Sequence, residues 1–177
     1  MRKVLNFVIV VVTILASFTI QTSVLPYLKA GGVTANLMIV VTCAFSFLLG
    51  ETPGLFLGLF AGLLSDLMFG PMFGFYGAVY ALIGFLCGKF KRLLFVEGLG
   101  FPVVMVAVSD LVYSFLSYVF LFLIRNRLFL ADFFVQLMLP EMIYTCVVTV
   151  PVFPVITWVY HKFMEPNHEV PADAGTS

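Results

Sequence analysis

Residues 50–74 read GETPGLFLGLFAGLLSDLMFGPMFG, and small residues return at every fourth position of this stretch. Glycine occupies positions 50, 54, 58, 62, 70 and 74, and the remaining step of the series is Asp66. These are six of the 14 glycines in the chain, so loose composition does not account for the pattern. A helix with glycine at every fourth position allows a neighbouring helix to approach its backbone closely. The stretch therefore predicts a tightly packed helix with a carboxylate on the same row.

The composition places this stretch in a membrane. Hydrophobic residues make up 62% of the 177 residues and charged residues 10%, and the mean hydropathy is +1.14. Soluble domains are typically about 45–50% apolar and about 25% charged. We predict an all-α integral membrane protein, because a helix satisfies its own backbone groups where lipid offers no partners. The net charge of zero gives no indication of a nucleic-acid partner.

Six apolar runs approach the length of about 20 residues that a helix needs to cross the hydrocarbon core. We predict a bundle of six transmembrane helices, at about residues 4–25, 34–50, 53–69, 72–88, 99–124 and 133–161. An alternative with five spans would fuse or demote one of the short, glycine-rich third and fourth runs. The helices form a single transmembrane domain over residues 1–165. The polar tail 166–177 is predicted to be disordered.

The basic residues favour six spans over five. With the N-terminus inside, the cytoplasmic ends carry Arg2, Lys3, Lys89, Lys91, Arg92 and Lys162, and the outside carries Lys29, Arg125 and Arg127. This asymmetry agrees with the positive-inside rule, and five spans would weaken it. We therefore predict a multi-pass membrane protein with both termini in the cytoplasm.

Gly54, Gly58 and Gly62, called the glycine row below, form two overlapping GxxxG steps on the third predicted helix. Four residues overshoot one helical turn by about 40°, so the row is a slanted strip suited to a right-handed helix crossing. Two uses of such a strip compete. It packs against another helix of the same bundle, or it docks a helix of another protein.

Polar side chains also lie within the predicted spans, namely Gln21, Asp66, Asp110 and Glu141. A carboxylate at membrane depth costs roughly 2.5–3.5 kcal/mol on insertion scales, so it usually faces the interior of a bundle. No Lys or Arg lies inside a span to pair with these groups. Two alternatives stay open for the three carboxyl groups: they are protonated, or they accept hydrogen bonds from Ser65, Ser109, Ser114, Tyr113 or Thr145. Asp66 lies near a helix end, where a cap or an interfacial role is favoured over proton transfer.

The motifs of common enzymes are absent from the sequence. Asp66 and Asp110 lack the GxGD context of intramembrane aspartyl proteases, in which two carboxylates share a proton. Nothing matches HExxH, GxSxG or a P-loop. Cys43, Cys87 and Cys146 lie in apolar runs without metal-ligand spacing and are interpreted as packing residues. We expect no enzymatic activity, no cofactor and no bound metal.

A six-helix chain of this size resembles the substrate-binding components of energy-coupling-factor vitamin transporters. The short third and fourth spans are typical of interrupted transporter helices. Those components dock through an Ala-xxx-Ala ridge on the first helix, where this chain has only Ala16. Polar groups that would hold a vitamin are also sparse. A substrate-binding component of a small-solute transporter is the alternative function.

Several ordered features together resemble the family of the rod shape-determining protein MreD. They are Gln21 followed by Pro26, NLMIV at 36–40, Gly50, Gly54, GLFAGLLSDLMFG at 58–70, and GFYGAVYALIGFLCG at 74–88 ahead of a basic loop. The 58–70 stretch is the most specific of these, because it is similar to the family's glycine-rich run that ends in aspartate. The family often has Pro-Asp before the second helix, where this chain has Ala35-Asn36. Asn36 is still able to cap that helix.

The resemblance implies a non-enzymatic component of the bacterial elongation machinery, in the inner membrane, that supports peptidoglycan synthesis and rod shape. The implied partners are MreC, the actin-like MreB, the glycosyltransferase RodA and a class B penicillin-binding protein, besides membrane lipid. The implied fold is similar to the transporter components above. Our leading hypothesis is a scaffold that binds the single transmembrane helix of MreC through the glycine row and Asp66.

Overall fold

The computed structural model describes residues 2–28, 33–69, 73–90, 100–125 and 139–164, which form six α-helices and one 3-10 turn. The elements are α1 (Arg2–Ser23), η1 (Leu25–Leu28), α2 (Leu37–Leu49), α3 (Glu51–Phe69), α4 (Phe75–Lys89), α5 (Gly100–Arg125) and α7 (Leu139–Phe163). The ends of the first five helices lie within three residues of the predicted ranges. The predicted start of the last helix at residue 133 and the tail 166–177 lie outside the described residues.

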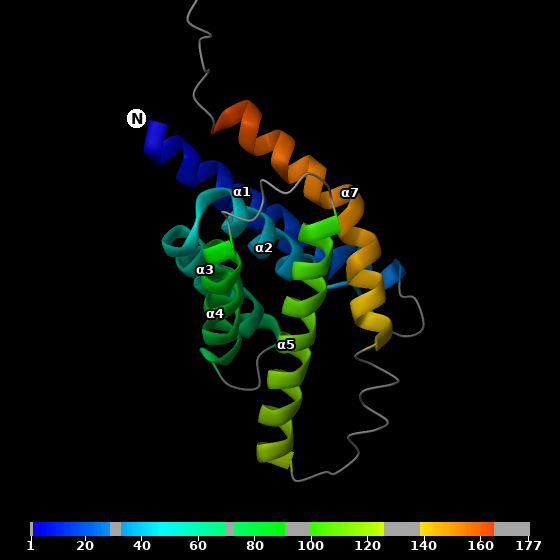
Figure 1. Cartoon of the computed structure of the whole chain (residues 1–177). Coiled ribbons are helices and arrows are strands. Elements are labelled where there is room, and N and C mark those ends of the chain that lie inside the picture. The colour runs from blue at the N-terminus through cyan, green and yellow to red at the C-terminus, as the bar shows by residue number, and fades with distance from the viewer. Residues whose placement is uncertain (1, 29–32, 70–72, 91–99, 126–138, 165–177) are drawn as a thin grey trace, which may run out of the picture.

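Helix α2 is the centre of the molecule. Every residue from Leu37 to Phe47 is buried, and α2 contacts α1, α3, α4, α5 and α7. Figure 1 shows it in cyan, with the other helices around it. A helix that is apolar all round is found either inside a protein core or in lipid, and the contacts of α2 place it in the core. The 13 residues of α2 therefore form the core against which the longer helices pack.

Two short breaks and one proline shape the α2–α3–α4 part of the chain. Gly50 ends α2 with φ 106°, a left-handed backbone conformation that favours glycine, and α3 begins at the next residue. Pro53 lies in the first turn of α3, where its missing N–H costs nothing. Gly74 precedes α4 with φ 100°. These turns fold α3 and α4 back on each other as an antiparallel hairpin.

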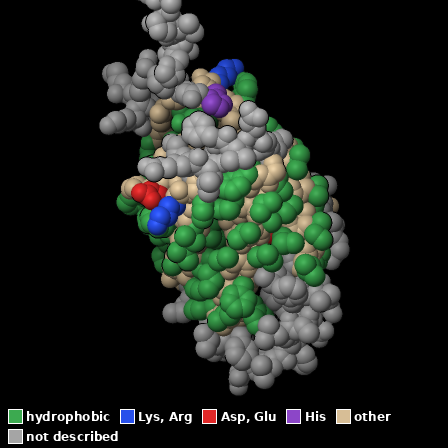
Figure 2. Space-filling model, viewed as in Figure 1, with side chains coloured by type: hydrophobic (Ala, Val, Ile, Leu, Met, Phe, Trp, Pro, Cys, Tyr) green, Lys and Arg blue, Asp and Glu red, His purple; other side chains and the backbone are tan. Residues whose placement is uncertain are grey.

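The surface and the long helices identify an all-α membrane protein. Asn6–Tyr27, Gly100–Phe120 and Leu139–Phe163 are long and apolar enough to cross a membrane, and only 22–28% of each is buried within the molecule. Leu37–Leu49 and Phe75–Lys89 are apolar but shorter. On the face that Figure 2 shows, hydrophobic side chains are spread over much of the described surface. By length and composition, then, three of the six predicted spans are found.

The two ends of the described chain lie together. Figure 1 shows the N-terminus of α1 and the C-terminal end of α7 at the same end of the molecule. Close to that end of α7, the Nζ of Lys162 lies 4.5 Å from the centroid of the Trp158 ring. Trp158 is exposed. An exposed Trp beside a Lys is typical of the membrane–water interface.

Candidate functional site: a glycine-packed hairpin and a polar pocket

The glycine row of α3 lies directly against the backbone of α4. A methyl group added at Gly58 would overlap the carbonyl oxygen of Tyr80 and lie 2.6 Å from its carbonyl carbon. One added at Gly62 would lie 2.6 Å from the Cα of Gly77. At Gly54 it would lie 2.5 Å from the carbonyl oxygen of Gly84. Each step of four residues along α3 thus meets α4 at one regular antiparallel register.

Helix α4 contributes glycines of its own to this contact. Gly84 meets the backbone of Gly54, and a methyl group at Gly88 would lie 2.5 Å from the carbonyl carbon of Gly50. Gly77 completes this face of α4, opposite Gly62. The sequence analysis did not single out these three residues. Their separations of seven and four residues place them on one helical face, which is the signal that would have found them.

The glycine row is therefore occupied within the chain. Of its two predicted uses, packing inside the bundle is the one that the geometry shows. A helix of another protein docked against Gly54, Gly58 and Gly62 would need a groove that α4 already fills. At Gly58 and Gly62 the nearest atoms are all backbone, so the two helices pack more closely there than most helix pairs do.

Asp66 caps the N-terminus of α4 from the last turns of α3. Its Oδ1 accepts a hydrogen bond from the backbone N–H of Tyr76 at 2.9 Å. Its Oδ2 accepts from the N–H of Gly74 at 3.0 Å and of Gly77 at 2.9 Å. Helix N-termini leave up to four N–H groups without partners, and negative side chains are favourable there. The carboxylate at the end of the glycine row thus joins the two helices that the row packs together.

Gln21 and Asn36 cap the N-terminus of α2 in the same manner. The Oε1 of Gln21, from α1, accepts from the N–H of Met38 at 2.8 Å. The Oδ1 of Asn36 accepts from the N–H of Ile39 and, at 2.9 Å, from the hydroxyl of Tyr80 on α4. The N–H of Asn36 donates to the Oγ1 of Thr145 on α7. Asn36 thus fulfils the capping role expected of it and connects three helices.

Tyr80→Phe should lower the free energy of unfolding by about 1 kcal/mol, because it removes a buried hydrogen bond to the cap of α2. Tyr80 is 1% exposed. Thermal unfolding of the purified protein in detergent measures the change. Tyr27→Phe is the matched control, since that side chain is 89% exposed. Equal effects of the two substitutions would show that the Tyr80–Asn36 bond contributes nothing.

Glu141 and Asp110 lie in different surroundings. Glu141, in the first turn of α7, lines a pocket of about 320 Å³. Asp110, on α5, is 0% exposed, and neither of its carboxyl oxygens has a hydrogen-bond partner among the described residues. Thr145, one of the donors expected for the three carboxyl groups, gives its hydroxyl proton to the backbone oxygen of Glu141, at 2.9 Å.

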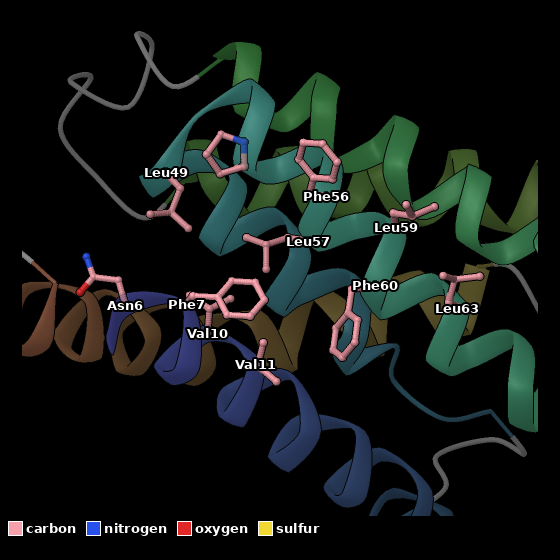
Figure 3. A pocket seen from close by; sticks show the side chains of 11 residues that line it. Asn6, Phe7, Val10, Val11, Leu49, Phe56, Leu57, Leu59, Phe60 and Leu63 are labelled. Carbon is pink, nitrogen blue, oxygen red and sulfur yellow. The ribbon is translucent and has the colours of Figure 1, made fainter. Parts of the chain in front are cut away.

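An apolar groove separates α1 from the side of α3 opposite the glycine row (Figure 3). Its volume is about 560 Å³. Figure 3 shows Phe7 and Val11 of α1 across from Phe56 and Phe60 of α3. Phe7 is 69% and Phe56 64% exposed. The sequence analysis missed this groove, because hydrophobic residues surround α3 on every side that lacks glycine.

Two of the three cysteines come together in the core. The Sγ of Cys87 on α4 lies 3.3 Å from the Sγ of Cys43 on α2, and both are free thiols. Cys87 also lies 3.4 Å from the hydroxyl of Ser109. The sequence offers no signal for this pairing, since the two residues are far apart in the chain. Within the described residues, no three His, Cys, Asp or Glu side chains form a group that would hold a metal ion.

Comparison with known protein families gives a match that covers most of the chain. A protein-family model of the rod shape-determining protein MreD matches residues 1–163. No curated protein and no solved structure gave a match. The family match includes every described helix and all the residues of the caps and the glycine row. The chain therefore belongs to the MreD family of rod shape-determining proteins.

Proposed function

We propose that this protein is a non-enzymatic scaffold of the bacterial elongation machinery that binds the transmembrane helix of MreC in the inner membrane. The observation that carries the proposal is the family match over residues 1–163. MreB, RodA and a class B penicillin-binding protein complete the proposed complex. In it, the chain helps to hold the enzymes of lateral cell-wall synthesis in one place.

The proposed topology has six membrane-embedded helices in one domain and both termini in the cytoplasm. The shared position of the two ends in Figure 1 supports an even number of crossings. The basic residues support the cytoplasmic side for these ends. Helix α2 has only 13 residues, but it is enclosed by protein. A helix that does not contact lipid along its length does not have to match the thickness of the bilayer.

A non-enzymatic role is supported by the position of the carboxyl groups. An aspartyl-protease dyad needs two carboxylates that share a proton. Both oxygens of Asp66 are taken by three backbone N–H groups at the start of α4. Asp66 is therefore not available to act with Asp110. The alternative function, a substrate-binding component of a small-solute transporter, would depend on the polar pocket, whose ligand chemistry is considered below.

The groove between α1 and α3 is our proposed binding site for the MreC helix. It is the face of α3 that remains after α4 has covered the glycine row. Its exposed rings, Phe7 and Phe56, are rigid and large, which suits anchors at an interface. A single apolar helix of MreC lying in the groove would contact α1 and α3 together and shield both rows of side chains from lipid.

Site-specific photo-crosslinking in cells tests this assignment. A benzophenone-bearing residue at Phe56 should give an adduct with MreC, because Phe56 borders the groove. Val147 on α7 provides the matched control, since its exposed fraction of 61% is close to the 64% of Phe56. We expect a several-fold stronger MreC adduct at position 56. An MreC adduct at position 147 alone, or only lipid adducts at position 56, would refute the groove as the MreC site.

A further inference from the structure

A polar pocket lies at the end of the bundle where α1 finishes and α2 begins. Its volume is about 320 Å³, which is within the usual range for small-ligand sites, about 300–1,000 Å³. It is lined by Gln21, Thr22, Pro26, Thr34, Ala35, Asn36, Ser65, Tyr80, Tyr113 and Glu141. Residues from five helices thus converge on one space, and the proposed MreC groove is lined by a different set of residues.

Some hydrogen-bonding groups of the pocket already bond to α2, and others do not. The side-chain oxygens of Gln21 and Asn36 accept bonds from the N-terminus of α2. Their amide nitrogens remain as donors, because a side-chain amide carries two N–H groups besides its oxygen. Glu141 contributes a carboxyl group, which is an acceptor when it is charged. The pocket therefore offers donors at the α1–α2 side and an acceptor at the α7 side.

A second carboxyl group, that of Asp110, lies near this pocket but does not line it. Asp110 interacts electrostatically with both Glu141 and Tyr80. It is 0% exposed, and among the described residues neither of its oxygens has a hydrogen-bond partner. The described Lys and Arg side chains form no ion pair with either carboxyl. Glu141 is the carboxyl group that lines the pocket, and a positively charged group there is the ligand chemistry that would complement it.

Two aromatic rings line part of the same space. Tyr80 and Tyr113 both line the pocket, with their ring centroids 5.4 Å apart in an edge-on arrangement. Tyr76 lies beside Tyr113, with a centroid distance of 5.5 Å. The faces of aromatic rings attract cations, and ammonium groups in particular are bound by rings and carboxylates together.

We propose that this pocket binds a molecule with a primary ammonium group, which is placed at Glu141 between the tyrosine rings. The amide nitrogens of Gln21 and Asn36 hold a polar acceptor of the same molecule. A lipid headgroup of the phosphoethanolamine type and a small soluble amine share this chemistry. The proposal does not depend on the MreC groove.

Thermal unfolding of the full-length protein separates the two sources. The soluble probes are glycerophosphoethanolamine and lysine, added to protein in detergent. The lipid probe is phosphatidylethanolamine in nanodiscs, compared with nanodiscs of phosphatidylglycerol alone. Binding near 100-fold excess over Kd should raise Tm by about 5 °C or more. A rise in Tm with the lipid probe alone would identify the ligand as a lipid headgroup. A rise in Tm with a soluble amine would identify a soluble ligand. No shift with any of the probes would overturn the proposal.

Glu141→Gln is the decisive variant, because it removes the charge and keeps the shape. We expect it to abolish the ligand-dependent shift while leaving the unliganded Tm unchanged or higher. Glu51→Gln, at an exposed glutamate in the first turn of α3, is the control and should keep the full shift. An equal shift in wild type and Glu141→Gln would also overturn the proposal. Photo-crosslinking to MreC should be the same in all three proteins, so its failure would count against the scaffold function alone.

Discussion

Gly58→Leu is expected to lower the free energy of unfolding of the isolated protein by about 3 kcal/mol or more. This is at or above the largest losses that are typical of overpacked cores. A methyl group alone would already overlap the carbonyl of Tyr80. The obstacle is backbone and not the end of a flexible side chain, so no rotamer change relieves it. The α3–α4 hairpin has to open, and the contacts on either side of Gly58 are lost with it.

Chemical or thermal unfolding of the purified chain, with MreC absent, measures this effect. Gly100→Leu is the matched control, because a Cβ at Gly100 has nothing within 4 Å. The experiment also separates the two uses of the glycine row. If the row docked MreC, Gly58→Leu would leave the chain stable alone and weaken only its binding to MreC. An unfolding curve equal to that of Gly100→Leu would therefore contradict the packing described here.

The close approach along α3 could be predicted from the sequence, but its partner could not. Glycine at every fourth residue indicates that a backbone comes near, whichever chain that backbone belongs to. Choosing α4 requires the hairpin, which depends on the turn before Phe75. The matching face of α4, at Gly77, Gly84 and Gly88, was visible as spacing but was not used. When the glycine spacing on α4 is taken into account, packing of the glycine row within the chain becomes the stronger prediction.

For the polar residues too, the need for a partner could be predicted from the sequence, but the partner itself could not. The cost of burying charge predicts that Asp66, Asp110 and Glu141 avoid lipid, but not which groups they meet. Asp66 finds its partners eight to eleven residues later, after a turn whose path is not determined by local periodicity. Gln21 reaches a helix that begins sixteen residues further on. The donors expected for the three carboxyl groups are neighbours of one or another of them in the sequence, and none bonds to the carboxyl group of Asp110.

A common design underlies these contacts. The N-termini of α2 and α4 are each capped by a side chain from the helix that precedes them in the chain, Gln21 of α1 and Asp66 of α3. Tyr80 of α4 then bonds to Asn36, the N-cap of α2. In lipid, an unsatisfied N–H costs several kcal/mol, so these caps replace the water that would serve a soluble protein. The two shortest apolar helices are thus held by polar bonds at one end and by close packing along their length.

Asp66→Ala should lower the free energy of unfolding by about 3 kcal/mol or more, which is the largest loss we expect for any polar residue. Bonds to a charged acceptor contribute about 1.5–3 kcal/mol each, and three N–H groups lose their partner together. Two of these bonds are buried. Asp66→Asn keeps one oxygen and loses the other acceptor, so we expect an intermediate loss and a protein that still folds.

Hydrogen exchange of the backbone amides shows whether the loss has the predicted cause. In Asp66→Asn, the amides of Gly74, Tyr76 and Gly77 should exchange faster, while those in the middle of α2 keep their protection. Glu51→Ala is the control, because Glu51 is an exposed acidic residue at the start of the same helix. Unchanged exchange at these three amides in Asp66→Asn would show that the carboxylate does not cap α4. Faster exchange throughout the chain would mean instead that the cap is needed for the whole bundle to hold together, because α4 packs on both α3 and α2.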